Sequence, residues 1–304
     1  MSRIKVTILG TTAGVPTPQR AHASIFISYD DGNEVPMLFD CGEGTQRQMM
    51  SAGINMMKLD DIFITHWHGD HCLGLAGLVD TMGFEGRTKE LHIHCPEARK
   101  GRRLIKRSYS MGKVRVVLDN LRSSGSRIDK VFENDRFVVV SVPVRHSIPA
   151  VAFGIFEKDK VCVSVEKARQ AGLPEEGKFY SELKEKGETY LDGRRVCLEE
   201  ISTVKKGRRI VYSGDTEICD NLKALAAGAD LLIQDCTYFS NDITEKNYKH
   251  AALPEVLEMI KAEKVKRTVL THIGRKYSDP AALEKMLEGA ANVSVAYDMM
   301  ELVV

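Results

Sequence analysis

The feature that most constrains this chain is the stretch 66–71, which reads H-W-H-G-D-H and places four metal-ligating side chains within six residues. The apolar run over 60–65 that precedes it predicts a buried strand, and the apolar run over 72–79 that follows predicts a helix. The cluster is therefore expected on a loop between a strand and a helix. A cluster this dense is far more specific than a lone surface histidine, so we interpret it as part of a metal site.

The spacing within the cluster predicts how it would bind metal. Side chains two residues apart in an extended segment point the same way, so His66 and His68 are expected to share one ion. Asp70 and His71 open the following helix and are expected to face a point beside that ion. Adjacent pairs of nitrogen and carboxylate ligands suit two zinc-class ions roughly 4 Å apart.

A site for two ions needs more ligands, and three further candidates each follow an expected strand: His146, Asp215 and His272. Strand ends at one edge of a sheet sandwich can converge on one point, so we predict that these residues complete the site. The first ion takes His66, His68 and His146, the second takes Asp70, His71 and His272, and Asp215 bridges both. His92 and His94 have the same spacing within a strand, but no ligand-type partners are expected near them, and we interpret them as structural.

Strands come first in runs along the chain and then alternate with helices. Expected strands at 4–9, 24–29 and 36–40 precede the cluster, whereas the later strands are separated by helical patterns. Two mixed sheets packed face to face, with helices outside, satisfy this order. The predicted fold class is therefore α/β, in a single domain over 1–304.

The segment 158–207 differs from the rest of the chain in composition. It is rich in Lys and Glu, contains several glycines and shows little core pattern. We predict an insertion that protrudes from the domain as an arm, with a helix over Val165–Ala171.

The overall composition, 43% hydrophobic and 28% charged, is typical of a soluble globular protein. No apolar run reaches the ~18 residues of a membrane span, so no membrane partner is expected. The first residues lead directly into a strand rather than a signal peptide. Seven scattered cysteines without a C-x-x-C pair indicate reduced core thiols, and we predict a cytoplasmic location.

The net charge of +1 hides a local concentration of positive charge. Between Arg99 and Arg115 lie eight basic residues and no acidic one. A helix is predicted here, from Pro96 to about Tyr109. Such a basic face is consistent with contact to nucleic-acid phosphates, although a solvated helix face explains the same pattern.

Five stretches, together with the metal-ligand pattern, resemble ribonuclease Z, the tRNA 3′-processing endonuclease branch of the metallo-β-lactamase superfamily. They are Leu9–Thr17, Leu38–Gln46, His146–Pro149, Tyr212–Thr216 and Leu270–Ile273. The phrase F-D-C-G-E-G-T-Q in the second stretch is more specific than the zinc motif, which many hydrolases share. The resemblance implies a metallo-β-lactamase αββα sandwich, two Zn²⁺ per chain with Mn²⁺ as the alternative, a pre-tRNA substrate and a homodimer.

The resemblance also implies roles for catalytic residues. Asp70 would orient the attacking water and accept its proton, and His250 would stabilise the phosphate or protonate the leaving 3′ oxygen. Asp40, at the end of an expected strand, could fix a ligand imidazole by accepting its second N–H. The 158–207 arm would hold the body of a folded RNA by shape and phosphate contacts. The sequence thus predicts a zinc-dependent endoribonuclease that removes the 3′ trailer of pre-tRNA.

Two other interpretations of the same residues stay open. One is a general zinc phosphodiesterase or 3′ exoribonuclease of the same fold, and the other is a metal-bound RNA-binding protein without catalysis. The chain departs from the usual family pattern at Pro18, Ala21, Lys178 and Gly274. These departures concern how the RNA is held, and they leave the metal ligands unchanged.

Overall fold

The computed structural model describes residues 2–106, 114–174, 176–191, 193–240, 249–277 and 279–304. The chain divides into two compact units. The larger comprises Met1–Asn134, Val138–Phe156 and Arg209–Val304, and the smaller comprises Asp135–Phe137 and Glu157–Arg208.

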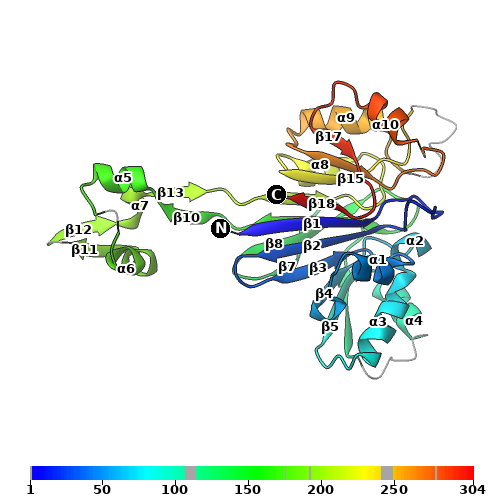
Figure 1. Cartoon of the computed structure of the whole chain (residues 1–304), viewed down its shortest axis with the longest axis horizontal. Helices are drawn as coiled ribbons and strands as arrows, with labels where there is room; N and C mark the ends of the chain where they lie inside the picture. The colour runs from blue at the N-terminus through cyan, green and yellow to red at the C-terminus, as the bar shows by residue number, and fades with distance from the viewer. Residues whose placement is uncertain (1, 107–113, 175, 192, 241–248, 278) are drawn as a thin grey trace. The chain divides into compact units, whose positions relative to one another are not determined.

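Two seven-stranded sheets form the larger unit within the described residues (Figure 1). The first sheet has the order β18 (Met300–Val303), β1 (Arg3–Gly10), β2 (Ser24–Asp30), β3 (Val35–Phe39), β4 (Asp61–Phe63), β5 (Leu91–Pro96) and β6 (Val116–Leu121). Neighbours from β18 to β3 are antiparallel, and those from β3 to β6 are parallel. The first sheet is therefore mixed, as predicted.

The second sheet is mixed as well. Its order is β17 (Val293–Val295), β16 (Thr268–Thr271), β15 (Leu231–Asp235), β14 (Arg209–Tyr212), β9 (Ala150–Glu157), β8 (Phe137–Val144) and β7 (Asp129–Glu133). Strands β17 to β14 run parallel, whereas β9 is antiparallel to β14 and β7 is antiparallel to β8. The predicted α/β class with two mixed sheets is confirmed, although β7 and β18 were not predicted.

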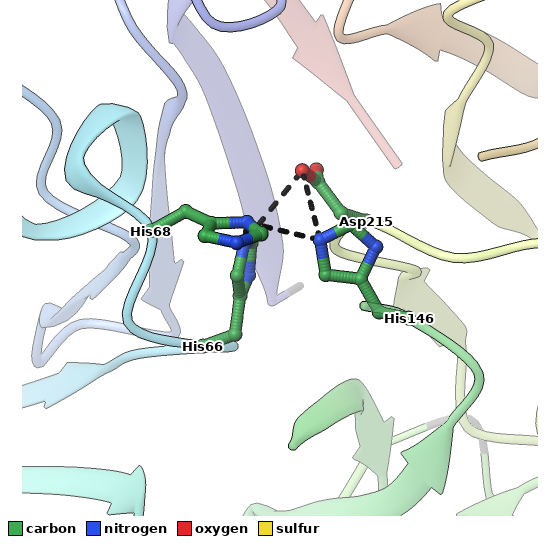
Figure 2. Close-up of side chains that lie close together, drawn as sticks. All are labelled: His66, His68, His146 and Asp215. Carbon is green, nitrogen blue, oxygen red and sulfur yellow. Dashed lines mark hydrogen bonds and ion pairs between the residues drawn. The ribbon is translucent and has the colours of Figure 1, made fainter. Parts of the chain in front are cut away.

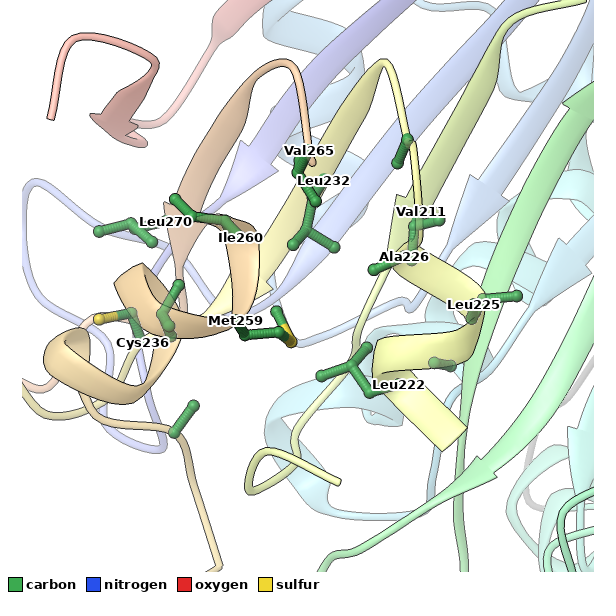
Figure 3. Close-up of a cluster of buried hydrophobic side chains, with 14 of the residues drawn as sticks. Val211, Leu222, Leu225, Ala226, Leu232, Cys236, Met259, Ile260, Val265 and Leu270 are labelled. Carbon is green, nitrogen blue, oxygen red and sulfur yellow. The ribbon is translucent and has the colours of Figure 1, made fainter. Parts of the chain in front are cut away.

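Helices flank both sheets (Figure 1). Those of the first half are α1 (Thr45–Ser51), α2 (Gly69–Cys72), α3 (Gly74–Phe84) and α4 (Ala98–Ile105), and those of the second half are α8 (Asp220–Ala226), α9 (Leu253–Ala262) and α10 (Pro280–Met286). Helix α8 buries Leu222, Leu225 and Ala226, the spacing of one apolar helix face. Figure 3 shows these side chains together with Met259 and Ile260 of α9 in one buried cluster that includes residues of the second sheet.

Aromatic side chains fill the space between the two sheets. Phe39 of β3 stacks on Phe63 of β4, with ring centroids 4.7 Å apart. Phe153 of β9 meets both rings edge-on at 5.6 Å, and Tyr212 of β14 lies 6.5 Å from Phe39. All four are fully buried, so the sheets pack face to face through a continuous apolar layer.

The smaller unit contains the predicted insertion. It has two two-stranded sheets and three helices in its described residues: β10 (Lys160–Val163) with β13 (Ser202–Lys205), β11 (Glu188–Leu191) with β12 (Arg194–Cys197), and α5 (Val165–Gln170), α6 (Phe179–Lys186) and α7 (Leu198–Ile201). The helix predicted over Val165–Ala171 is confirmed as α5. Although the sequence of this segment shows little core pattern, a buried cluster gathers Ala168, Leu173, Leu183, Val196 and Ile201. These positions are too widely spaced in the sequence to form a periodic pattern.

The predicted basic helix is shorter than expected. Pro96 ends β5 instead of opening the helix, and Glu97 turns the chain in the left-handed region with φ 48°. Helix α4 then covers Ala98–Ile105, and residues 107–113 of the predicted helix and basic stretch lie outside the described residues.

All seven cysteines are free thiols, as predicted. Five are buried, but Cys162 is exposed and Cys197 is half-buried, so the expectation of core thiols fails for these two. Among the described helices, none combines the length and the apolar character needed to cross a bilayer.

Candidate active site

The 66–71 cluster follows β4 as expected, with His66 and His68 on the connecting loop and Asp70 and His71 in the short helix α2. His68 precedes α2 in an extended conformation, and His66 and His71 are buried while Asp70 is half-buried. The loop after β3 packs closely against the cluster. A Cβ at Gly42 would lie 2.2 Å from the carbonyl oxygen of Asp70, so only glycine fits at this position.

One group of side chains brings together residues from three separate segments (Figure 2). Nδ1 of His68 lies 3.0 Å from Nε2 of His66 and 3.0 Å from Nε2 of His146. Oδ2 of Asp215 lies 3.6 Å from Nε2 of His66 and 3.9 Å from Nε2 of His146. One ligand atom from each of these residues therefore lies within 4.8 Å of all the others.

The second group shares Asp215 with the first. Nε2 of His71 lies 3.1 Å from Oδ1 of Asp215 and 3.7 Å from Oδ2 of Asp70. Nε2 of His272 lies 3.2 Å from Oδ2 of Asp215 and 3.3 Å from Oδ2 of Asp70. The structure thus brings all seven sequence-predicted ligand residues together in two adjoining groups, with Asp215 between them.

The donor sets fit divalent metal ions. Nε2 of His71 is buried and makes no hydrogen bond of good geometry with the described residues, although it faces two carboxylates. In the first group, three imidazole nitrogens converge on one point beside a carboxylate, and nitrogen with carboxylate oxygen is the donor chemistry that zinc-class ions take. A metal ion held by the second group would be a partner for the unpaired Nε2 of His71.

Asp40 orients the imidazole of His71. Its Oδ2 accepts a hydrogen bond from Nδ1 of His71 at 2.7 Å, which directs Nε2 at the second group. The carboxylate is fully buried, with φ 57°, and is held by Thr65 N–H at 2.8 Å and the Tyr212 hydroxyl at 2.8 Å. The predicted role for Asp40, fixing a ligand imidazole through its second N–H, is confirmed in geometry.

The pKa values of the buried histidines shift in opposite directions in the two groups. Burial lowers the pKa of His146 to about 4 and that of His66 well below 6.5, so these imidazoles are neutral. Burial also opposes charge on His71, but Asp215 and Asp40 raise its pKa well above 6.5. Burial also opposes charge on His272, but Asp215, Asp235 and Asp70 together raise its pKa to about 10. Because an imidazole must lose its proton to bind a metal ion, binding of an ion by the second group would release protons.

A third set of contacts places His250 beside both groups. Its Nδ1 lies 2.7 Å from Oδ2 of Asp235, and its ring stacks on that of His272 with centroids 4.9 Å apart. Burial opposes charge on His250, but Asp235 raises its pKa above 6.5. Asp235 is fully buried and also accepts hydrogen bonds from Thr216 N–H and Thr237 N–H at 3.1 and 3.0 Å.

Sequence analysis missed Asp235. It ends β15, so the signal that identified Asp215, a carboxylate directly after an expected strand, was present here too. His92 and His94 do have ligand-type partners, contrary to expectation, since Oδ2 of Asp119 lies 3.1 Å from Nδ1 of His92 and 3.4 Å from Nδ1 of His94. They contact carboxylates on the first sheet and belong to none of the three metal-capable groups found among the described residues.

Comparison with known proteins identifies the class. A family model described as a beta-lactamase superfamily domain matches residues 200–273, and one described as anti-Pycsar protein Apyc1 matches residues 4–135. The metallo-beta-lactamase fold protein YhfI from Bacillus subtilis superposes with a TM-score of 0.69 at 17% identity, covering 99% of this chain and 100% of that one. The fold and the His/Asp site therefore define a metal-binding protein of the metallo-β-lactamase fold.

Full-length relatives narrow the class to one family. Ribonuclease Z of Methanococcus maripaludis (strain C5) is 35% identical over 312 residues, covering 98% of this chain and 97% of the relative. Ribonuclease Z of Bacillus subtilis (strain 168) is 33% identical over 307 residues, covering 98% of each. The human short-form tRNase Z structure aligns at 25% identity and a TM-score of 0.69 over 98% of both chains. The chain belongs to the ribonuclease Z family, which confirms the resemblance inferred from its motifs and makes it an endoribonuclease that hydrolyses phosphodiester bonds.

Proposed function

We propose that this member of the ribonuclease Z family hydrolyses the phosphodiester at the 3′ end of pre-tRNA and so removes the 3′ trailer. The observation that carries the proposal is the convergence of Asp70, His250 and the two ligand groups at one point, in a chain matched over its full length by ribonuclease Z relatives. Hydrolysis of a phosphodiester needs an oriented water, compensation of phosphoryl charge and a proton for the leaving oxygen. The site offers a residue for each task.

Two divalent ions of the zinc class, with Mn²⁺ as the alternative, would be held by the two groups. His66, His68 and His146 would hold the first, Asp70, His71 and His272 the second, and Asp215 both. Such ions supply an acidified water and neutralise phosphoryl charge when bound. Seven ligands are too many for one tetrahedral ion, so elemental analysis after saturation and desalting is expected to give two ions per chain. A single tight ion would remove the bridging role of Asp215.

Asp70 and His250 handle two different protons, one on the attacking water and one for the leaving oxygen. Asp70 orients the attacking water and accepts its proton through a carboxylate that is only 13% exposed. Nδ1 of His250 is hydrogen-bonded to Asp235, so Nε2 is the nitrogen of His250 that can contact the substrate. From there His250 protonates the leaving 3′ oxygen or stabilises the phosphate, and Asp235 fixes its orientation.

RNA docking is assigned to surfaces outside the metal site. The basic side chains of α4 are all exposed, as phosphate contacts require: Arg99, Lys100, Arg102 and Arg103. The arm over 158–207 holds the body of the RNA by shape and phosphate contacts. The protein acts as a cytoplasmic homodimer, in which the arm of one subunit serves the active site of the other.

One observation favours a second candidate, a general zinc phosphodiesterase or 3′ exoribonuclease. Arg20 is one of the few residues of the 16–21 loop that match the family pattern, yet its guanidinium donates hydrogen bonds to Thr11 Oγ1 and Ala296 O, both at 2.7 Å. An arginine engaged in this way is not offered to an RNA end. If this second candidate is correct, the protein should distinguish less sharply between different RNA 3′ ends.

Cleavage of end-labelled pre-tRNA, compared with a small phosphodiester, tests the proposal. Pre-tRNA lacking a 3′ CCA sequence is expected to yield one discrete product at the trailer junction, with a specificity constant well above that of the small substrate. A ladder of products shortened from the 3′ end would indicate the exonuclease. Equal efficiency on both substrates would indicate the general phosphodiesterase, and a matched pre-tRNA carrying CCA measures end discrimination.

A further inference from the structure

The loop over residues 11–21, which connects β1 to β2, is tied to the segment that carries a candidate metal ligand. Ile273, directly after His272, donates its N–H to Thr11 O at 2.8 Å and accepts from Ala13 N–H at 3.1 Å. The loop also closes on itself, because Thr11 N–H donates to Ala21 O at 3.0 Å. This 11–21 loop therefore has a defined position beside the second ligand group.

From that position the loop reaches the proposed general base. Gly14 N–H donates to Oδ2 of Asp70 at 2.9 Å, the same oxygen that lies 3.3 Å from Nε2 of His272. Gly14 has φ 62°, a conformation that side chains other than glycine rarely adopt. The loop amide thus defines the direction in which this carboxylate oxygen points.

The half-buried carboxylate of Asp298 holds both ends of the loop. Oδ1 of Asp298 accepts the Thr11 hydroxyl at 2.7 Å, and Oδ2 accepts Ala21 N–H at 2.6 Å. Gln48 of α1 donates to the same Oδ2 at 3.0 Å and to Leu9 O at 2.7 Å. One carboxylate thus accepts hydrogen bonds from Thr11, Ala21 and Gln48 and joins the two ends of the loop to each other and to α1.

Asp298 is itself anchored to both sheets. It lies between β17 and β18, in a segment where Ala296 N–H donates to Leu270 O of β16 and Met299 N–H donates to Ile8 O of β1, both at 2.8 Å. Arg20 adds a further link, because its Nη1 donates both to Ala296 O and to the Thr11 hydroxyl that reaches Asp298. The turn that carries Asp298 is therefore fixed to both sheets by backbone hydrogen bonds.

We propose that Asp298, acting through Thr11 and Arg20, is a positioning residue that holds the 11–21 loop so that Gly14 N–H orients Asp70. None of these three side chains touches a metal-ligand side chain among the contacts of the described residues. The inference rests on the proposed function for its effect on turnover, but the geometry of the loop can be measured without any substrate. It also gives Arg20 a structural task in place of an RNA contact.

Hydrogen exchange of the metal-loaded protein without substrate tests the geometry directly. In Asp298→Ala, the amides of 11–21 are expected to exchange about tenfold faster or more, because the loop opens locally. The matched control is Glu301→Ala, which removes a carboxylate of the same terminal segment that only forms an exposed ion pair with Lys5 at 2.6 Å. Unchanged exchange at 11–21 in a folded Asp298→Ala protein overturns the proposal.

Steady-state kinetics on a small phosphodiester tests the consequence. Asp298→Ala is expected to lower kcat by roughly 10- to 100-fold, the size of effect that a small misplacement of a catalytic group produces. KM and the number of bound ions are expected to stay unchanged, and Glu301→Ala should match the unaltered protein. An effect confined to KM for pre-tRNA would make Asp298 part of an RNA-binding surface and overturn the positioning role.

A second pair of variants covers the case in which Asp298→Ala does not fold. Thr11→Val removes the hydroxyl at nearly constant volume, whereas Thr11→Ser retains it. Faster exchange at 11–21 and a lower kcat are expected for the valine variant only, and equal behaviour of the two variants overturns the proposal. If the unaltered protein cleaves a small phosphodiester but not pre-tRNA, the proposed function fails while the exchange comparison still decides the role of the loop.

Discussion

The two compact units of this chain differ in how their side chains are brought together. In the larger unit, the ends of several strands far apart in sequence deliver seven ligand-type side chains to one point, and buried carboxylates such as Asp40 and Asp235 orient the imidazoles. In the smaller unit, five buried residues form a separate core. Val161 and Val204, cross-strand partners there, are more than half exposed. The site of the larger unit needs many long-range contacts, whereas the smaller unit has a small core of its own that keeps its shape.

Replacing Asp70 by Ala should have the largest effect. The variant loses a carboxylate of the second group and the proposed proton acceptor together, so turnover of pre-tRNA and of a small phosphodiester should both be abolished. Pre-tRNA binding, measured by filter retention, should persist. Asp220→Ala, an exposed carboxylate on α8, is the control. Residual turnover of either substrate near the unaltered rate would show that Asp70 is not catalytic.

His250→Ala should have the next largest effect and leave the ligand groups intact. Loss of a positioned acid or base lowers turnover by about 10²–10⁴-fold, and we expect this for both substrates with two ions still bound. His92→Ala removes an imidazole outside the ligand groups and should leave turnover unchanged. If His250→Ala instead lost an ion, His250 would belong to the metal site.

Removing the smaller unit should produce the opposite pattern. Lys160 and Lys205 are paired across β10 and β13, so replacing 161–204 by Asn-Gly closes a short hairpin at that pair. We expect pre-tRNA binding to weaken at least about tenfold, while hydrolysis of the small phosphodiester survives, because all the ligands lie outside this segment. A folded variant that still processes pre-tRNA at the full rate would make the arm assignment wrong, and docking would have to rely on surfaces such as α4.

A point substitution in the small core should have the mildest effect on turnover. Leu183 is fully buried, and Leu→Ala in a core costs about 2–5 kcal/mol. A core of five residues has little stability to spare, so Leu183→Ala should make the smaller unit sensitive to limited proteolysis and weaken pre-tRNA binding. Turnover of the small phosphodiester should not change. Val161→Ala, at an exposed site of the same unit, should alter neither property, and equal protease sensitivity of the two variants would argue against an independent core.

Much of the site was predictable from the sequence because ligand chemistry is local. The spacing of His66, His68, Asp70 and His71 depends only on the geometry of a strand, a loop and a helix start, and the structure places all four as expected. Further ligands could be found because strand ends recur in the sequence, and the order of strands and helices restricts the fold to two mixed sheets.

The sequence predicted that Asp40 fixes a ligand imidazole, but only the tertiary structure decided which imidazole it meets and which groups hold it in place. Asp40 meets His71 31 residues away, and the Tyr212 hydroxyl reaches Asp40 across 172 residues. Arg20 donates to Ala296 O, 276 residues away, a partner that no local pattern indicates. Local patterns carry the identity of a metal ligand, because coordination chemistry selects the residue type. They do not identify a specific hydrogen-bond partner on another strand, because the packing of the two sheets brings that partner into contact.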